Sequence, residues 1–123
     1  MPNLKMYCVV SKEALDLMKG NRGKLGAQIG HAFLHAYWNA EKVTPDLATQ
    51  YRESQSAYKI VLMVPTIEEV IHLSKLYEDD CGVSLITDAG FTVFDEPTTT
   101  CVGIGPIDPN EREEILKNAK ILI

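Results

Sequence analysis

Apolar residues recur with two different periods along the chain, and each change of period marks a predicted element. Runs rich in β-branched and aromatic residues predict strands at residues 5–11, 58–64 and 83–87. A fourth strand is expected from about residue 98 to residue 104. The run at 58–64 is nearly all apolar, which is typical of a strand that is buried on both faces.

Between these runs the apolar residues recur at steps of three and four, which is the period of an amphipathic helix. Four helices are predicted, over residues 24–40, 46–54, 66–77 and 108–119. Pro45 marks the break between the first two. Thr66 and Glu69 form a capping box, and Asp108 followed by a proline is a typical helix start. Residues 11–17 are compatible with one helical turn or a loop, and residues 120–123 with a last short extended segment.

Strands that alternate with helices indicate an α/β fold with a mixed sheet. We therefore expect a three-layer α/β/α sandwich with a four-stranded mixed β-sheet. The sequence contains no internal repeat, low-complexity tract or linker, so residues 1–123 are predicted to form one domain.

Composition excludes several classes of protein. The 123 residues are 46% hydrophobic and 24% charged, which is ordinary for a globular domain. No apolar run reaches the roughly 20 residues that span a bilayer, and the N-terminus lacks the apolar segment of a signal peptide. A cytoplasmic protein without a membrane partner is predicted. Three cysteines without paired spacing argue against a disulfide framework and a zinc site.

The net charge is −5, but three cations gather immediately before the longest predicted helix, at Lys19, Arg22 and Lys24. A helix N-terminus already carries partial positive charge, so this cluster favours an anion site there. The alternative is a loop with a solvated charge run. The sequence argues against a P-loop, because Lys24 is followed by Leu25 rather than by Ser or Thr and the glycine spacing is short.

Lys24, Gln28, His31 and His35 form a polar column on one side of the predicted helix. Two histidines four residues apart can share a metal, yet no Glu lies between them in the HExxH pattern and no third ligand has suitable spacing. No metal site is predicted. His31 is either a catalytic group or a histidine of the core or cleft.

Two further segments carry candidate chemistry. Asp88 ends a strand, where ligand sites form in open α/β sheets, but it could equally build a turn with Gly90. Alternation predicts that Thr98 and Thr100 point to the same face, although threonines are also ordinary strand residues.

Together these segments resemble the type 2 peptidyl-tRNA hydrolases, whose pattern reads KGKxAAQxxHA, then DAGxT, then TxTxxGIGP. Here the matching segments are Gly23–Ala32, Asp88–Thr92 and Thr98–Pro106, in the same order and over essentially the whole chain. The resemblance implies hydrolysis of the ester between a peptide and the 3′ ribose of tRNA. It also implies a four-stranded mixed sheet, a homodimer and no cofactor.

The resemblance also implies which residues form the active site. The family's functional positions fall on Lys24, His31, Asp88, Thr92, Thr98 and Thr100. Gln28 is a motif residue that we group with substrate binding. Our hypothesis is direct attack by water, with Asp88 orienting or deprotonating the water and Lys24 stabilising the oxyanion. His31 would polarise or shuttle a proton, the threonines would bond water or ester, and the cations Lys19 and Arg22 would contact tRNA phosphates.

The chain departs from the family pattern at four places. Arg22 replaces a lysine, Ser56-Ala57 replaces Gly-Gln, Thr87 replaces an arginine, and His35 replaces a small residue. Two alternatives therefore remain open: an inactive module that binds RNA or protein, and a hydrolase of another ester or amide.

Overall fold

The structure is a computed structural model that describes residues 3–90 and 96–122, and it contains a five-stranded mixed sheet. The strands are β1 (Lys5–Ser11), β2 (Lys59–Val64), β3 (Val83–Asp88), β4 (Thr98–Ile107) and β5 (Lys120–Ile121), in the order β3-β4-β1-β2-β5. β1 is parallel to β2, and the other pairs are antiparallel. The mixed α/β fold is confirmed. The expected four strands are wrong, because the last extended segment pairs with β2 at Leu62 and Met63.

The observed helices match the predicted ones except near the C-terminus. They are α1 (Lys12–Met18), α2 (Arg22–Val43), α3 (Pro45–Glu53), α4 (Ile67–Tyr77), the 3₁₀ turn η1 (Pro109–Glu111) and α5 (Glu114–Asn118). For residues 11–17 the sequence was compatible with one helical turn or a loop, and the structure shows a helix there. The Ser11 hydroxyl caps this helix, α1, by accepting from the Ala14 N–H at 3.0 Å.

The single helix expected from Asp108 to about residue 119 is wrong. Asp108 does begin a helical turn, since its Oδ1 accepts from the Asn110 N–H at 3.0 Å. The turn cannot continue, because the Glu113 N–H donates to the Tyr77 hydroxyl at 2.6 Å. The Pro109 carbonyl, which a longer helix would offer to Glu113, accepts instead from Arg112 Nε at 2.9 Å.

Small residues hold α2 against the sheet. Ala32, Ala36 and Ala40 are fully buried along one side of the helix. A Cβ added to Gly103 of β4 would lie 2.1 Å from the Ala32 carbonyl oxygen. A Cβ on Gly82, just before β3, would lie equally close to the Ala36 carbonyl oxygen. The backbones of helix and sheet therefore touch here, and only glycine allows this approach.

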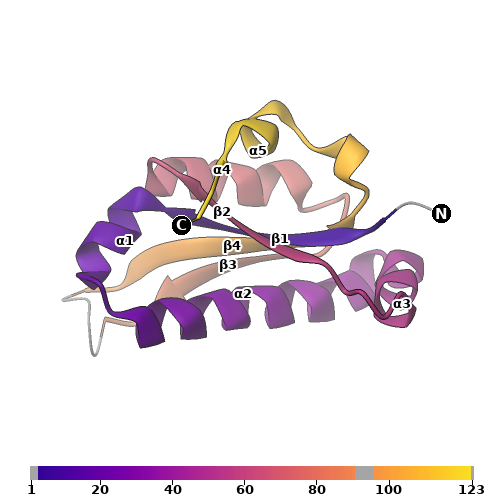
Figure 1. Ribbon diagram of the computed structural model, residues 1–123, viewed down its shortest axis with the longest axis horizontal. Helices are drawn as coiled ribbons and strands as arrows, with labels where there is room; N and C mark the ends of the chain where they lie inside the picture. Colours follow the sequence, from indigo (N-terminus) through magenta and orange to yellow (C-terminus); the bar gives the residue numbers. More distant parts are fainter. Residues whose placement is uncertain (1–2, 91–95, 123) are drawn as a thin grey trace.

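The opposite face of the sheet is covered by α4 and α5 (Figure 1). Its core is built from large side chains rather than small ones, including Tyr7, Leu73, Ile104 and Leu116. No helix in the described part of the chain is long and apolar enough to cross a membrane.

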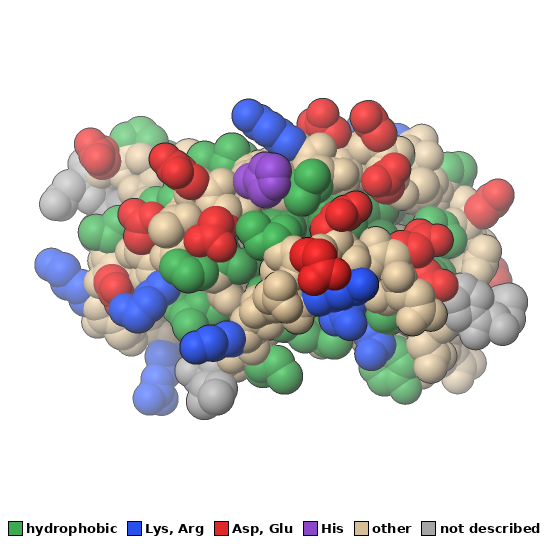
Figure 2. Space-filling model, turned by 90° about the horizontal axis from the view of Figure 1, so that it is seen from above, with side chains coloured by type: hydrophobic (Ala, Val, Ile, Leu, Met, Phe, Trp, Pro, Cys, Tyr) green, Lys and Arg blue, Asp and Glu red, His purple; other side chains and the backbone are tan. Residues whose placement is uncertain are grey.

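More than half of the 17 acidic residues belong to the segments that cover this second face. They are Glu68, Glu69, Glu78, Asp79, Asp80, Asp108, Glu111, Glu113 and Glu114. Figure 2 shows this side of the molecule, with Asp and Glu side chains spread across it. The face that carries α4 and α5 is therefore a poor surface for a polyanion.

Candidate functional site

The candidate site is centred on an ion pair between two distant parts of the sequence. Lys24 lies in the first turn of α2, and Asp88 is the last residue of β3. Lys24 Nζ pairs with Asp88 Oδ2, and the two side chains are only 19% and 8% exposed. The close packing of α2 on the sheet brings the helix start to the strand end. The structure thus brings these two predicted site residues into direct contact, while their catalytic roles stay a prediction.

The surroundings of Asp88 favour its charged form. The hydrogen bond from Lys24 holds the pKa of this carboxyl below its usual value of 3.8, and the Gly90 N–H, which donates to Oδ1 at 2.9 Å, lowers it further. Partial burial opposes this shift but does not overcome it. Asp88 is therefore an anion at neutral pH. The turn with Gly90 is present, and Asp88 pairs with Lys24 at the same time, so the turn does not exclude a ligand site, which stays a prediction.

Gln28 connects this pair to β4. Its Nε2 donates to Asp88 Oδ2 at 3.4 Å, and its Oε1 accepts from the Thr100 hydroxyl at 2.8 Å. The amide of Gln28 is thereby fixed at both ends, which orients the side of the Asp88 carboxylate that faces α2. Lys24, Asp88, Gln28 and Thr100 form one continuous network, which we call the Lys24–Asp88 network.

A β-bulge places Thr100 in this network. Ile86 pairs with Cys101, but the next residue of β3, Thr87, pairs with Thr99, so Thr100 is the extra residue of β4. Thr100 and its neighbour Cys101 both reach Gln28, since the Cys101 thiol lies 3.6 Å from the Gln28 carbonyl oxygen. Bulges redirect side chains in this way and are frequent beside active sites.

Thr98 lies next to the network. It is 8% exposed and is the cross-strand partner of Asp88 in the β3–β4 ladder. Its hydroxyl donates to the Glu96 carbonyl at 2.9 Å, which leaves the hydroxyl oxygen as an acceptor.

The remaining predicted residues lie around the network or beyond it. His31 is exposed one turn after Gln28, and its ring centroid is 4.1 Å from that of His35. In the described part of the chain no hydrogen bond or ion pair joins His31 to Asp88, so its proton-shuttle role stays a prediction. Lys19 and Arg22 are exposed between α1 and the start of α2. Thr92 lies outside the described residues.

Sequence reasoning missed the role of Asn21. Its Oδ1 accepts from the Lys24 N–H at 2.9 Å and caps α2, so one of the backbone donors expected for a bound anion already has a partner. An Asn immediately before a helix is a recognisable N-cap signal, which the cation cluster obscured. Among the described residues, no group of three or more His, Cys, Asp or Glu side chains could hold a metal ion.

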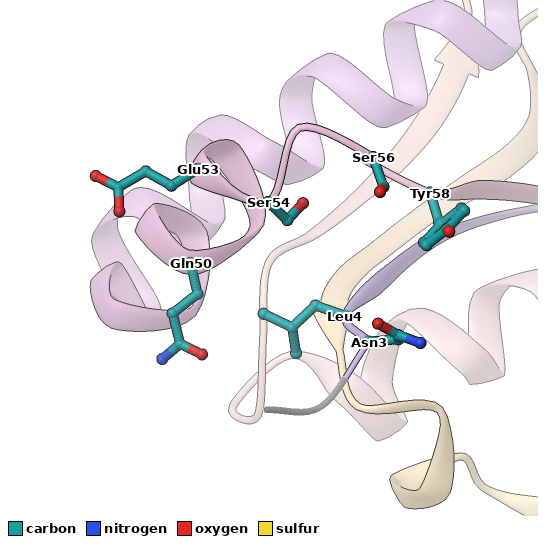
Figure 3. Close-up of a pocket in the computed structure, with 7 residues that line it drawn as sticks. All are labelled: Asn3, Leu4, Gln50, Glu53, Ser54, Ser56 and Tyr58. Atoms are coloured by element: carbon teal, nitrogen blue, oxygen red, sulfur yellow. The ribbon is translucent and has the colours of Figure 1, made fainter.

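A hollow of about 430 Å³ lies elsewhere, between the N-terminal segment, α3 and the start of β2 (Figure 3). It is lined by Gln50, Ser56 and Tyr58 among others, so it includes one of the positions where the chain departs from the family pattern. It opens at the end of the molecule remote from the last residue of β3 (Figure 1). The departure at Ser56-Ala57 therefore lies away from the Lys24–Asp88 network.

Comparisons with known proteins agree with the resemblance. A model of the family Peptidyl-tRNA hydrolase PTH2 matches residues 4–122. A protein of Methanococcus vannielii named peptidyl-tRNA hydrolase is 35% identical over 106 residues, which are 85% of this chain and 90% of the relative. Proteins of the same name from Methanopyrus kandleri and Methanocaldococcus jannaschii are 40% and 33% identical, over 79% and 97% of this chain and 79% and 100% of their own lengths. The chain belongs to the PTH2 family of peptidyl-tRNA hydrolases.

Proposed function

We propose that this protein hydrolyses peptidyl-tRNA and frees the tRNA from the peptide by direct attack of water on the ester. The single observation that carries the proposal is the Lys24–Asp88 pair, held at the end of β3 by the amide of Gln28. Family membership and the names of the relatives support the same activity. The protein would thus act on an ester that joins a peptide acyl group to a ribose hydroxyl.

In this mechanism Asp88 accepts a hydrogen bond from the attacking water and takes a proton as the water oxygen bonds to the ester carbon. The low pKa of Asp88 makes it a weak base, so its main contribution is to orient the water. Lys24 would donate to the oxygen that becomes negative in the tetrahedral intermediate. The C–O bond to the ribose then breaks, and the proton held by Asp88 passes to the leaving 3′ oxygen.

The other predicted residues have supporting roles in this proposal. Thr98, next to Asp88, would hydrogen-bond the water or the ester, with Thr92 in the same group. Thr100 was predicted for the same role, but it is fully buried and its hydroxyl donates to Gln28, so it would act through Gln28. His31 would contact the substrate from the next turn of α2. Lys19 and Arg22 would receive tRNA phosphates, which predicts binding that weakens as salt is added.

Three broader expectations belong to the same proposal: a three-layer α/β/α arrangement, a homodimer and a cytoplasmic location. Helices on both faces of the sheet support the first. Light scattering of the purified protein tests the second, and a single monomeric mass at working concentration would contradict it.

The activity is tested with three substrates: N-blocked aminoacyl-tRNA, free aminoacyl-tRNA and a small ester without RNA. We expect release from the blocked aminoacyl-tRNA alone. Tight binding without release would select the inactive binding module, and cleavage of the small ester alone would select a different hydrolase. Lys24→Ala and Asp88→Asn should each lower kcat about 10²- to 10³-fold, because each removes a group placed at the reacting atoms.

The chain offers a matched control for these variants. Lys12 and Asp16 form a second lysine–aspartate pair, at 3.0 Å, but their side chains are 61% and 68% exposed. Lys12→Ala and Asp16→Asn should leave kcat unchanged, since exposed pairs contribute little. Near wild-type cleavage by both Lys24→Ala and Asp88→Asn would refute the mechanism.

A further inference from the structure

We propose that three aromatic side chains of α2 form a platform on which unpaired RNA bases stack. The platform consists of His31, His35 and Trp38 and is called the α2 platform below. The inference rests on the proposed function, because it names the part of the substrate that the platform holds: the single-stranded 3′ end of the tRNA, next to the ester.

The three rings are already arranged as a continuous row. The His31 and His35 ring centroids are 4.1 Å apart with an interplanar angle of 31°, and those of His35 and Trp38 are 5.0 Å apart at 65°. Steps of four and three residues keep the rings on one side of the helix. His31 and Trp38 are exposed, and Trp38 is 48% exposed. A flat base can therefore reach a ring without any rearrangement of the fold.

Stability alone does not account for this placement. Trp38 is the only tryptophan of the chain, and half of its large apolar surface faces solvent. Exposed aromatic rings are the usual means by which proteins bind single strands, because every base has a face that stacks. Leu34, one turn earlier, is 47% exposed as well, so a second copy of the chain is the rival occupant of this side of α2.

Charge favours RNA over that rival. No acidic residue occurs from Arg22 to Ala40, whereas acidic residues crowd the opposite face of the sheet. Asp88 does contact the start of α2, but its charge is balanced by Lys24. A phosphate backbone that follows α2 from Arg22 as far as Trp38 therefore meets little repulsion from the helix itself, since its first acidic residue is Glu41.

The platform also continues from the Lys24–Asp88 network. His31 follows Gln28 by three residues, so it lies about 5 Å farther along the helix axis, and Trp38 lies about 20 Å beyond Lys24. An ester held at Lys24 and Asp88 would thus leave the last nucleotides of the strand lying along α2.

The sole tryptophan makes the test direct, because Trp38 fluorescence reports the platform and nothing else. The full chain is titrated with a short single-stranded RNA ending in CCA and with an abasic strand of the same length and charge. We expect quenching by the first strand and little by the second. Equal quenching by both would overturn the proposal, since phosphates rather than bases would then be responsible.

Variants separate the platform from catalysis. Trp38→Ala should raise the Kd for the CCA strand about tenfold or more and raise KM more than it lowers kcat, whereas Trp38→Phe should retain most of the affinity. Leu34→Ala is the matched control, since it removes an equally exposed apolar side chain from the same helix and should not change the Kd. Unchanged affinity in Trp38→Ala would overturn the proposal, and circular dichroism checks that the variants are folded.

Failure of the platform and failure of the proposed function give different results. Asp88→Asn should lose cleavage but keep the fluorescence quenching. Cleavage by the wild type without base-dependent quenching would refute the platform alone, and quenching without cleavage would refute the hydrolase alone. A Trp38 emission maximum that shifts on dilution and ignores RNA would also refute the platform, because a second copy of the chain would then cover it.

Discussion

The two faces of the sheet are built in opposite ways. On the face of α2, the backbones of helix and sheet touch through Ala32 and Gly103. On the face of α4 and α5, large side chains such as Leu73 and Leu116 fill a thicker core. On the first face less side-chain volume is buried, but the backbones of helix and sheet lie closer together. This proximity lets Lys24 and Gln28 reach groups at the ends of β3 and β4.

The two faces also differ in charge, and this difference removes the argument against an RNA partner that the net charge of the whole protein suggests. A net charge of −5 argues against an RNA partner when it is averaged over the molecule. Nine of the 17 acidic residues, however, lie in the segments that carry α4 and α5, on the side that Figure 2 shows, whereas α2 has none before Glu41. One face can therefore approach a polyanion while the other keeps the protein acidic.

The sharpest test of this contrast compares Gly103→Ala with Leu73→Ala. The alanine at position 103 would place its Cβ 2.1 Å from the Ala32 carbonyl, so α2 must move, and we expect a loss of about 3 kcal/mol in the free energy of unfolding. Leu73→Ala leaves a cavity and should cost about 2–5 kcal/mol. Urea denaturation measures both.

Activity distinguishes the two variants where stability does not. Assayed where both are folded, Gly103→Ala should lower kcat, because Lys24 and Gln28 move with α2, and Leu73→Ala should keep it. Gly26→Ala provides a control on α2, since nothing lies within 4 Å of its added Cβ and the helix should gain about 1 kcal/mol. A Gly103→Ala protein with wild-type kcat would show that the close approach does not position the site.

Substitution of Gln28 should have a smaller effect on kcat than substitution of Lys24 or Asp88. Gln28→Leu removes both hydrogen bonds of the amide and should lower kcat about tenfold, because Asp88 loses one of the groups that orient it. Gln28→Glu should be worse, since a second carboxylate beside Asp88 raises the pKa of the pair and competes for Lys24. The acidic limb of the pH–rate profile should then move to higher pH.

Asn39 offers the control for Gln28. It is another amide of α2 that bonds β3, with its Nδ2 donating to the Val83 carbonyl at 2.7 Å, but at the other end of the strand. Asn39→Leu should reduce stability slightly and leave kcat unchanged. If Asn39→Leu lowered kcat as much as Gln28→Leu, the effect would reflect general docking of α2 rather than the orientation of Asp88.

The sequence could predict the elements that depend on local periodicity, but not the features that depend on contacts between distant residues. The strands, α2 and α4 follow from local periodicity, and Lys24, Asp88 and Thr100 came from a resemblance spread over the whole chain. The break after Glu111 depends on Tyr77, which lies far away in sequence and supplies the bond that ends the turn. The bulge at Thr100 left no local signal, because alternation alone predicts an ordinary strand. Long-range contacts therefore decided these two features, whereas the missed Asn21 cap is a local contact that the sequence does signal.

The smallest expected effect is a pH dependence of stability. Because Lys24 and Gly90 hold the pKa of Asp88 below its usual 3.8, the charged carboxylate stabilises the folded state at neutral pH. This contribution is fully present above the pKa of the unfolded chain and is lost as pH falls below about 4. The difference in unfolding free energy between wild type and Asp88→Asn should therefore be constant from pH 7 to 5 and shrink towards pH 3.

The control for this prediction is Asp16→Asn, which breaks an exposed pair and should show little difference at any of these pH values. A difference for Asp88→Asn that stays constant down to pH 3 would mean that the charge of Asp88 does not contribute to the free energy of unfolding through the ion pair that holds α2 on the sheet.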